Sequence, residues 1–380
     1  MKNKKKKKIV WQQYITMILF MIVGAVCGIL MVECVDRSSG DQSLYQVFFT
    51  LIGLFIGMYA GLIIQIVIHE AGHLFFGLLS GYRFSSFRIF SFMWMKENGK
   101  IRLKRFSLAG TGGQCLMSPR DLVDGKIPVI LYNLGGSLMN VITGFVFLFL
   151  FFVFDSIPIL STEMLMLAVI GFAYAIMNGI PMRMGTVDND GYNAFALTRN
   201  SEAMFAFWVQ LKANDLISKG MRLKDMPDEW FCVPTDKEMK NSMIAVRGVF
   251  ACNRLLDARK FEEADRLMAH LLKIDSGIVG LHRNLLICDR IYVELITENR
   301  KEVLDEMLSK EQIKFMKQMK NLLSVLRTSY TYALLCEHDV KKAEQLKMQF
   351  EKRAKTYPYP NEVQSEWELM EHAGNVTENE

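Results

Sequence analysis

Four long apolar runs in the first half of the chain constrain its fold more than any other feature. They cover Ile15 to Val32, Val47 to about Leu79, Pro128 to Phe154 and Met164 to Pro181. Each is close to or longer than the roughly 20 residues that a helix needs to cross the hydrocarbon core of a bilayer. From about residue 199 onwards the chain is charged and soluble in character. The sequence therefore predicts a mainly α fold, with about four transmembrane helices followed by a cytosolic α-helical domain.

Positively charged residues predict how these helices are oriented. The first eight residues contain six Lys and the loop 82–127 contains nine Lys or Arg, whereas the loop 33–46 contains only Arg37. Cytoplasmic loops carry the Lys and Arg excess of membrane proteins, so we expect both termini and the loop 82–127 to be cytoplasmic. The first run is too long for a signal peptide and lacks a small-residue cleavage site, which predicts an uncleaved anchor. The net charge of +5 thus reflects membrane orientation and does not indicate a nucleic-acid partner.

The second apolar run contains the sequence His69-Glu70-Ala71-Gly72-His73. Side chains four residues apart share one face of an α-helix, so His69 and His73 can bind one zinc ion through their imidazoles. Glu70 then stands beside the metal without binding it, and can take a proton from a water molecule that zinc has made acidic. A chance match to so short a pattern is the alternative, but ionisable side chains at membrane depth are costly and seldom lack a function. Counting about 20 residues from Val47 places both histidines close to the cytoplasmic boundary.

Two further segments supply candidates for the rest of this site. A zinc ion with two His ligands commonly takes a carboxylate as its third protein ligand. Asp188 and Asp190 follow the fourth run, which returns to the predicted cytoplasmic side, although either can instead serve as a turn residue or helix cap. In the third run, Asn140 follows Gly135 and Gly136. We expect it to point into the bundle, where it either hydrogen-bonds to another helix or orients the carbonyl group of a substrate.

These motifs resemble those of the site-2 protease family of intramembrane zinc metalloproteases. That family has a His-Glu-x-x-His helix, a Gly-rich helix with an inward Asn, and an Asn-x-x-Pro segment followed by Asp-Gly. The same features stand here at residues 69–73, at Gly135 to Asn140, and at Asn178, Pro181, Asp190 and Gly191, so the resemblance covers about residues 45–195. It implies one zinc ion held by His69, His73 and Asp190, with Glu70 and Asn140 as catalytic residues. Asp188 stays the alternative ligand, because the spacing from Pro181 to Asp190 is longer than is common in the family.

Residues 83–108, between the second and third runs, predict a β-hairpin. Asn98-Gly99 separates two β-like runs, and this dipeptide is the strongest short-range hairpin signal. The first run carries Phe92 and Trp94, whose rings suit either packing on the protein or the membrane interface. The unpaired edge of the hairpin can receive an extended substrate by strand addition, or the hairpin can simply cover the helix bundle.

The soluble half predicts stacked helical hairpins. Leu255, Leu295 and Leu334 are each followed nine residues later by Ala or Leu, and they recur at intervals of 40 and 39 residues. Such recurrence is typical of helix pairs that share a continuous core, and here it resembles degenerate tetratricopeptide repeats. These repeats either bind a protein partner or form a structural cap. The seven cysteines are scattered without a CxxC pair, so neither a disulfide framework nor a cysteine metal site is indicated.

Together these features predict five segments and one function. The segments are a basic tail, anchor helix and outer loop (1–45), a catalytic membrane core with the hairpin (46–198), linker helices (199–240), the helical repeats (241–360) and a disordered tail (361–380). We expect a zinc endopeptidase, embedded in the lipid bilayer of a bacterial plasma membrane, that cleaves either membrane-anchored regulatory proteins or small peptide precursors. The lack of a PDZ-like stretch mildly favours the peptide precursors. The alternative is a non-catalytic membrane receptor or immunity scaffold that binds peptides through its repeats.

Overall fold

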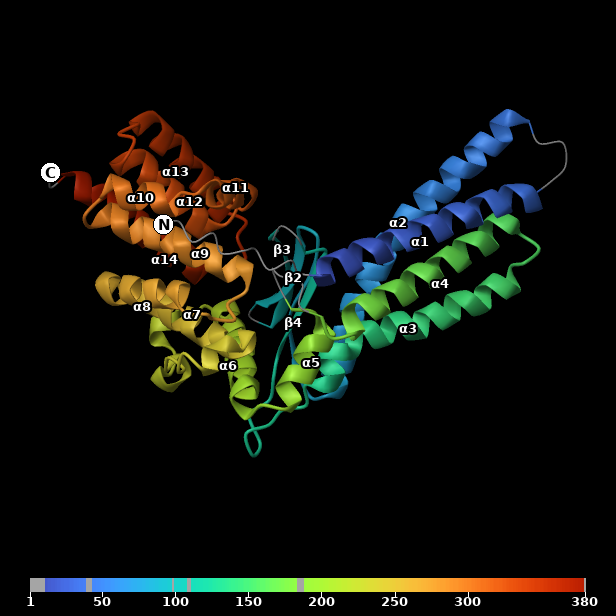
Figure 1. Ribbon diagram of the computed structural model, residues 1–380, viewed down its shortest axis with the longest axis horizontal. Coiled ribbons are helices and arrows are strands. Elements are labelled where there is room, and N and C mark those ends of the chain that lie inside the picture. Colours follow the sequence, from blue (N-terminus) through green and yellow to red (C-terminus); the bar gives the residue numbers. More distant parts are fainter. Residues whose placement is uncertain (1–10, 39–42, 98, 108–110, 183–187, 379–380) are drawn as a thin grey trace. The chain divides into compact units, whose positions relative to one another are not determined.

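The computed structural model describes residues 11–38, 43–97, 99–107, 111–182 and 188–378. In this part of the chain, four helices are long and apolar enough to cross a membrane. They are α1 (Trp11–Arg37), α2 (Leu44–Leu79), α3 (Ile130–Val153) and α4 (Pro158–Gly179) (Figure 1). Each coincides with a predicted apolar run, so the expectation of a mainly α, polytopic membrane protein is confirmed. The lysine-rich tail on which the orientation was predicted lies outside the described residues.

Helix α2 is unbroken over 36 residues. A capping box fixes its start: the Ser43 side chain accepts from the backbone N–H of Gln46, and the Gln46 side chain accepts from the backbone N–H of Ser43. At 1.5 Å per residue the helix is about 54 Å long, whereas the hydrocarbon core is about 30 Å thick. A helix of this length extends beyond the hydrocarbon core unless it is strongly tilted.

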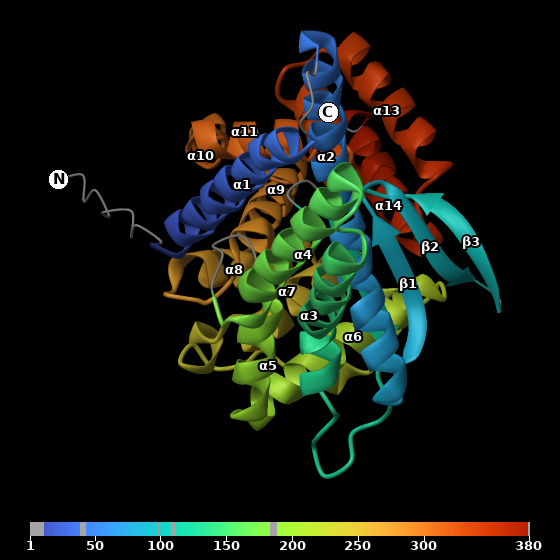
Figure 2. The ribbon, with the colours of Figure 1, turned by 90° about the vertical axis from the view of Figure 1, so that its right-hand side faces the viewer.

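Glycines allow the membrane helices to pack closely. Helix α3 packs against both α2 and α4, and the three helices run side by side (Figure 2). A Cβ atom at Gly61 would lie 3.1 Å from the side chain of Leu167 on α4, and one at Gly57 would overlap the Glu163 carboxyl group. These two glycines therefore serve helix packing, as small residues do in lipid. Gly53, the third member of the same sequence pattern, faces open space.

The segment between α2 and α3 forms a four-stranded antiparallel sheet, which is larger than the predicted hairpin. Its strands are β1 (Arg83–Ile89), β2 (Phe92–Glu97), β3 (Lys100–Arg105) and β4 (Gly113–Ser118), in the order β3-β2-β1-β4. The predicted hairpin is the β2–β3 pair, in which Glu97 lies opposite Lys100. Gly99 in the turn has a φ of 79°, a left-handed conformation that glycine adopts without steric cost, and its neighbour Asn98 lies outside the described residues. One face of β2 buries Met93 and Met95, whereas the other leaves Phe92 and Trp94 exposed.

The C-terminal half contains three helix pairs at the predicted positions. The pairs are α7 (Ser242–Asp257) with α8 (Phe261–Lys273), α9 (Gly280–Ile296) with α10 (Lys301–Met307), and α12 (Leu323–Leu335) with α13 (Val340–Ala354). The recurrent residues Ala264, Leu304 and Ala343 are each the fourth residue of the second helix, and all three are buried. Their identity as tetratricopeptide repeats stays a prediction. The remaining elements are α5 (Asp190–Thr198), α6 (Ser201–Ser218), α11 (Lys310–Gln318), α14 (Pro360–Glu378) and the short 3-10 helices Leu223–Asp225, Asp228–Phe231 and Glu238–Lys240.

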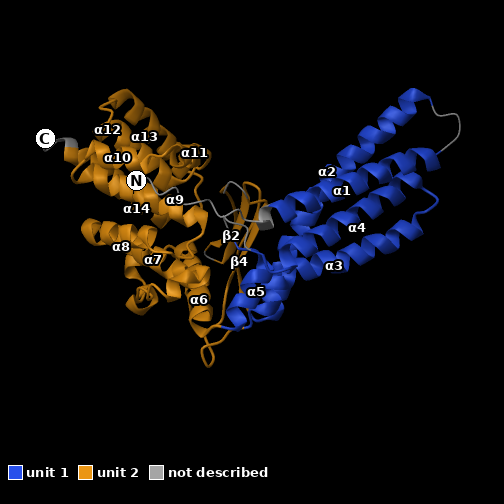
Figure 3. Ribbon diagram, viewed as in Figure 1, with its two compact units in different colours: residues 1–81, 128–199 blue, residues 82–127, 200–380 orange. Residues whose placement is uncertain are grey.

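The chain divides into two compact units (Figure 3). One contains residues 1–81 and 128–199, and the other contains residues 82–127 and 200–380. The sheet therefore belongs to the same unit as the helix pairs, and within that unit Phe106 stacks edge-on against Tyr357 and Tyr359. The functional division into five segments stays a prediction.

The disordered tail predicted for residues 361–380 is wrong over 361–378, which form most of helix α14. This helix buries Leu369, Met370 and Ala373 among apolar side chains of the C-terminal unit. The last residues are mostly polar, which suggested disorder. The buried residues nevertheless form an apolar stripe at helical spacing, which is enough to hold the helix against the other helices of this unit.

Several ionisable side chains lie inside the C-terminal unit. The guanidinium group of Arg327 is fully buried and donates to Asp289 and Glu366. The Tyr357 hydroxyl donates to Glu362 Oε1 at 2.9 Å. Burial, together with the nearby charge of Glu366, raises the pKa of Glu362 to about 7.

Candidate metal centre

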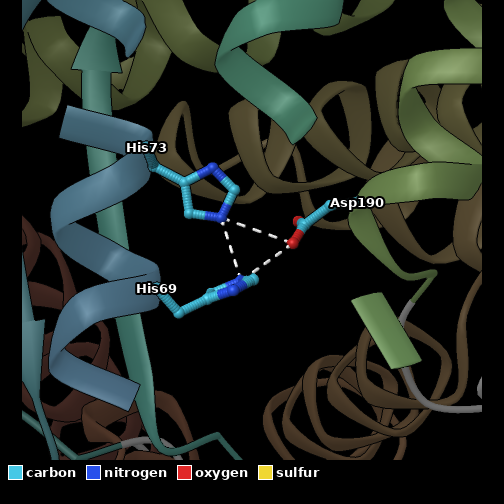
Figure 4. Close-up of side chains that lie close together, drawn as sticks. All are labelled: His69, His73 and Asp190. Atoms are coloured by element: carbon cyan, nitrogen blue, oxygen red, sulfur yellow. Dashed lines mark hydrogen bonds and ion pairs between the residues drawn. The ribbon is translucent and has the colours of Figure 1, made fainter. Parts of the chain in front are cut away.

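Helix α2 places the two histidines of its motif on one face. The Nε2 atoms of His69 and His73 lie 3.2 Å apart, and both side chains are buried (Figure 4). This is the arrangement expected of residues one helical turn apart. Glu70, between them in sequence, is also buried.

Asp190 joins the two histidines from the start of α5. Its Oδ2 atom lies 3.0 Å from His69 Nε2 and 3.3 Å from His73 Nε2 (Figure 4). Burial alone would raise the pKa of Asp190, but protonated His73 and His69, through their charge and their Nε2–H groups, hold it well below its usual range. Its carboxylate is therefore ionised at neutral pH.

Two neighbours of Asp190 fix its position. Asn189 is the N-cap of α5: its side chain accepts from the backbone N–H groups of Tyr192 and Met182 and donates to the Ile180 carbonyl. A Cβ atom at Gly191 would lie 2.2 Å from the Gly179 carbonyl oxygen, so only glycine allows this approach between α5 and the end of α4. Asn189 was not predicted from the sequence, although Asn is a preferred N-cap residue.

The glycines of α3 bring that helix against the histidine face of α2. A Cβ atom at Gly135 would lie 2.7 Å from the carbonyl oxygen of Gly72, and one at Gly136 would lie 2.5 Å from Cε1 of the His69 ring. The Gly-Gly pair thus provides the space in which the His69 ring sits.

Hydrogen bonds at the far side of each ring fix its tautomer. His69 Nδ1 lies 2.8 Å from Asn140 Oδ1, and His73 Nδ1 lies 2.7 Å from the carbonyl oxygen of Tyr132. Both partners are acceptors, so each Nδ1 must donate and each neutral ring presents an unprotonated Nε2. The two lone pairs therefore point toward the space shared with Asp190.

The Asn140 amide is itself held by Gln65. Asn140 Nδ2 donates to the Gln65 side-chain oxygen at 2.7 Å and to the Gln65 backbone carbonyl at 3.2 Å, and Gln65 Nε2 donates to the Leu167 carbonyl at 2.9 Å. Because two of these acceptors are backbone carbonyls, the orientation of both amides is unambiguous. Gln65 and Asn140 are fully buried. Gln65 was not predicted as part of the site; the sequence signal that could have indicated it is its position one helical turn before His69.

The three donor atoms match the dimensions of a zinc site. A tetrahedral zinc ion with bonds of about 2.0–2.1 Å holds its ligand atoms about 3.3 Å apart. The observed separations of 3.0, 3.2 and 3.3 Å agree with that value. Two neutral imidazoles and one carboxylate are also ligands that zinc prefers, and they leave a fourth position open. In the described residues, the group of potential ligands is His69, His73 and Asp190; it does not include Asp188.

Comparison with known proteins gives one match. A family model described as peptidase family M50 matches residues 57–334. This range covers more than half of the chain and includes every residue of the candidate centre. No curated protein and no solved structure matches the chain.

Proposed function

Because the chain belongs to peptidase family M50, the site-2 protease family of membrane metalloproteases, we propose that it is a zinc endopeptidase of the cytoplasmic membrane face. The observation that carries this proposal is the convergence of His69 Nε2, His73 Nε2 and Asp190 Oδ2 at tetrahedral spacing. These three residues would hold the ion. A bound zinc ion supplies Lewis-acid activation of a water molecule and of the scissile carbonyl group.

Glu70 is the proposed general base and acid. It takes a proton from the attacking water and later gives it to the nitrogen of the leaving amine. A carboxylate next to His69 on the same helix can do this without being a metal ligand. Its burial limits competing water around the transferred proton.

Asn140 is proposed to position His69. Its amide oxygen holds the Nδ1 proton of His69, and its amide nitrogen is engaged by Gln65. Partners of this kind orient a metal-binding imidazole and raise its basicity. We therefore assign Asn140 this role in place of direct contact with a substrate carbonyl.

The depth of the site supports hydrolysis near one membrane face. Along α2, His69 lies about 38 Å from Leu44, which exceeds the roughly 30 Å hydrocarbon core. His73 is six residues from the end of α2, Asp190 follows the end of α4, and Asn140 lies in the third turn of α3. With both termini in the cytoplasm of a bacterial cell, as the loop charges predict, this end of the bundle is the cytoplasmic one.

The proposed substrates are membrane-associated proteins or small peptide precursors. A helical substrate shields its peptide bonds through internal hydrogen bonds, so it must be extended before hydrolysis. Pairing with an edge of the sheet would keep it extended.

Replacing Glu70 by Gln tests the proposal, because it removes the proton carrier and keeps the size of the side chain. Membrane and secreted peptides of cells with wild-type protein are compared with those of cells with Glu70→Gln. We expect specific cleavage products to disappear, while purified Glu70→Gln protein keeps its zinc and its fold. A non-catalytic receptor or scaffold would give the same peptides in both strains. That outcome would refute the proposed protease function.

A further inference from the structure

A cavity of about 870 Å³ lies beside β3 in the C-terminal unit. One wall is β3 itself, and the other is formed by Lys355 and Thr356, which follow the end of α13. We call this cavity the basic groove, and its lining residues are Glu97, Lys100, Arg102, Leu103, Lys104, Arg105, Lys355 and Thr356.

The charge of the basic groove is strongly unbalanced. Five of its eight residues are Lys or Arg, and its one acidic residue, Glu97, lies 3.6 Å from Lys104. Lys100, Arg102 and Lys355 have no ion pair within the described part of the chain. Like charges gathered in a concavity focus a positive potential, which favours an acidic ligand.

The backbone of β3 adds a second recognition element. β3 is the outermost strand on its side of the sheet (Figure 2). The Arg105 N–H points away from β2 and donates to the Thr356 carbonyl at 3.4 Å, whereas the next N–H, of Phe106, turns back to Ser91. Because strand residues alternate in direction, the N–H and C=O groups of Leu103 and Ile101 also point outward. This row of outward groups can pair with another extended chain.

We propose that the basic groove binds an extended acidic segment of the peptide substrate, paired with the edge of β3 and neutralised by Arg102 and Lys355. The inference deepens the proposed function, since it assigns a charge class to the substrate. A concave groove next to an open strand edge fits a peptide strand better than it fits a flat membrane surface. The exposed side chains of Ile101 and Leu103 offer apolar contacts to the alternate residues of such a strand.

Binding is measured with full-length Glu70→Gln protein in nanodiscs of zwitterionic lipid. The probe is a fluorescent peptide of about eight residues, an ordinary strand length, in which Glu alternates with Val. A second peptide carries Gln in place of Glu. We expect the acidic peptide to bind more tightly, and the double variant Arg102→Gln, Lys355→Gln to weaken its binding about tenfold. Lys317→Gln removes an exposed charge of α11 that does not line the groove, and serves as the matched control.

A backbone variant tests strand pairing separately. Leu103→Pro removes an N–H that points away from β2, a position at which edge strands tolerate proline. We expect it to weaken peptide binding more than Leu103→Ala does, with circular dichroism unchanged.

These experiments distinguish failure of the proposed peptide groove from failure of the proposed protease function. Equal affinity for both peptides, or equal effects of the double variant and Lys317→Gln, would overturn the proposal that the groove binds an acidic peptide. So would loss of peptide binding in nanodiscs with anionic lipid, which would assign the groove to lipid headgroups. Because Glu70→Gln protein does not need to turn over, an intact preference for the acidic peptide together with missing zinc would instead refute the protease.

Discussion

Replacing Gly171 by Ala should weaken zinc binding although this residue lies on α4, away from the three donor atoms. A Cβ atom at this position would lie 2.8 Å from Gln65 Nε2 and 3.1 Å from Gln65 Cδ. Ordinary contact requires about 3.5 Å, so the Gln65 amide must move by about 0.6 Å or more. That amide is held between the Leu167 carbonyl at 2.9 Å and Asn140 Nδ2 at 2.7 Å, so at least one of these bonds is stretched beyond good geometry.

The effect then passes to His69 through Asn140. Loss of a partner behind a metal-binding histidine typically costs 10- to 100-fold in metal affinity. We expect the zinc Kd of Gly171→Ala to rise about tenfold, or about 1.4 kcal/mol. Competition between the purified apoprotein and a chromophoric chelator measures this change at neutral pH.

Gly144→Ala is the matched control. Its Cβ would also lie 2.8 Å from a side chain between α3 and α4, but that side chain is the apolar ring of Phe172. Both variants add one methyl group to a membrane helix, and both raise its helix propensity by about the same amount. If the two variants change the zinc Kd equally, the polar chain from Gln65 to His69 does not hold the metal site in place.

Three further results are expected. Asp190→Ala should lower bound zinc more than Asp188→Ala, as elemental analysis of both purified variants will show; the reverse order would move the third ligand to Asp188. Gly136→Ala puts a Cβ 2.5 Å from the His69 ring and should abolish stoichiometric zinc binding, measured in the same way, without unfolding the C-terminal unit. Glu362 has a raised pKa of about 7, so its stabilising contribution is complete below its unfolded pKa near 4.5 and is lost as the pH rises through 7. Glu362→Gln should therefore raise the free energy of opening of α14 at pH 8 by on the order of 2 kcal/mol, which slows its hydrogen exchange. At pH 5 the substitution should have little effect.

The membrane fold was predictable because hydropathy and helix length act locally. The four apolar runs coincide with α1 to α4, and the Asn98-Gly99 signal located the β2–β3 hairpin. Strands β1 and β4 were missed because neither is bounded by an equally strong turn signal, and their pairing joins residues up to 35 positions apart, as Arg83 and Ser118. Helix α14 was missed because its stability depends on contacts with distant repeats, which its own composition does not reveal.

The candidate metal centre was predictable to different extents. The spacing of His69 and His73 follows from helix geometry alone, and Asp190 is where the resemblance placed it. The supporting residues were not predictable in the same way, because Gln65 and the carbonyl of Tyr132 reach the site only through the packing of three helices. Which glycines face a partner, such as Gly136 and not Gly53, also depends on that packing.

Zinc K-edge X-ray absorption of the purified full-length protein at neutral pH tests the central claim most directly. We expect one zinc ion per chain, with two imidazole nitrogens and oxygen ligands at about 2.0–2.2 Å. In the double variant His69→Ala, His73→Ala the signal should vanish. Absence of zinc from the wild-type protein, or a first shell that contains sulfur, would contradict a centre built by His69, His73 and Asp190.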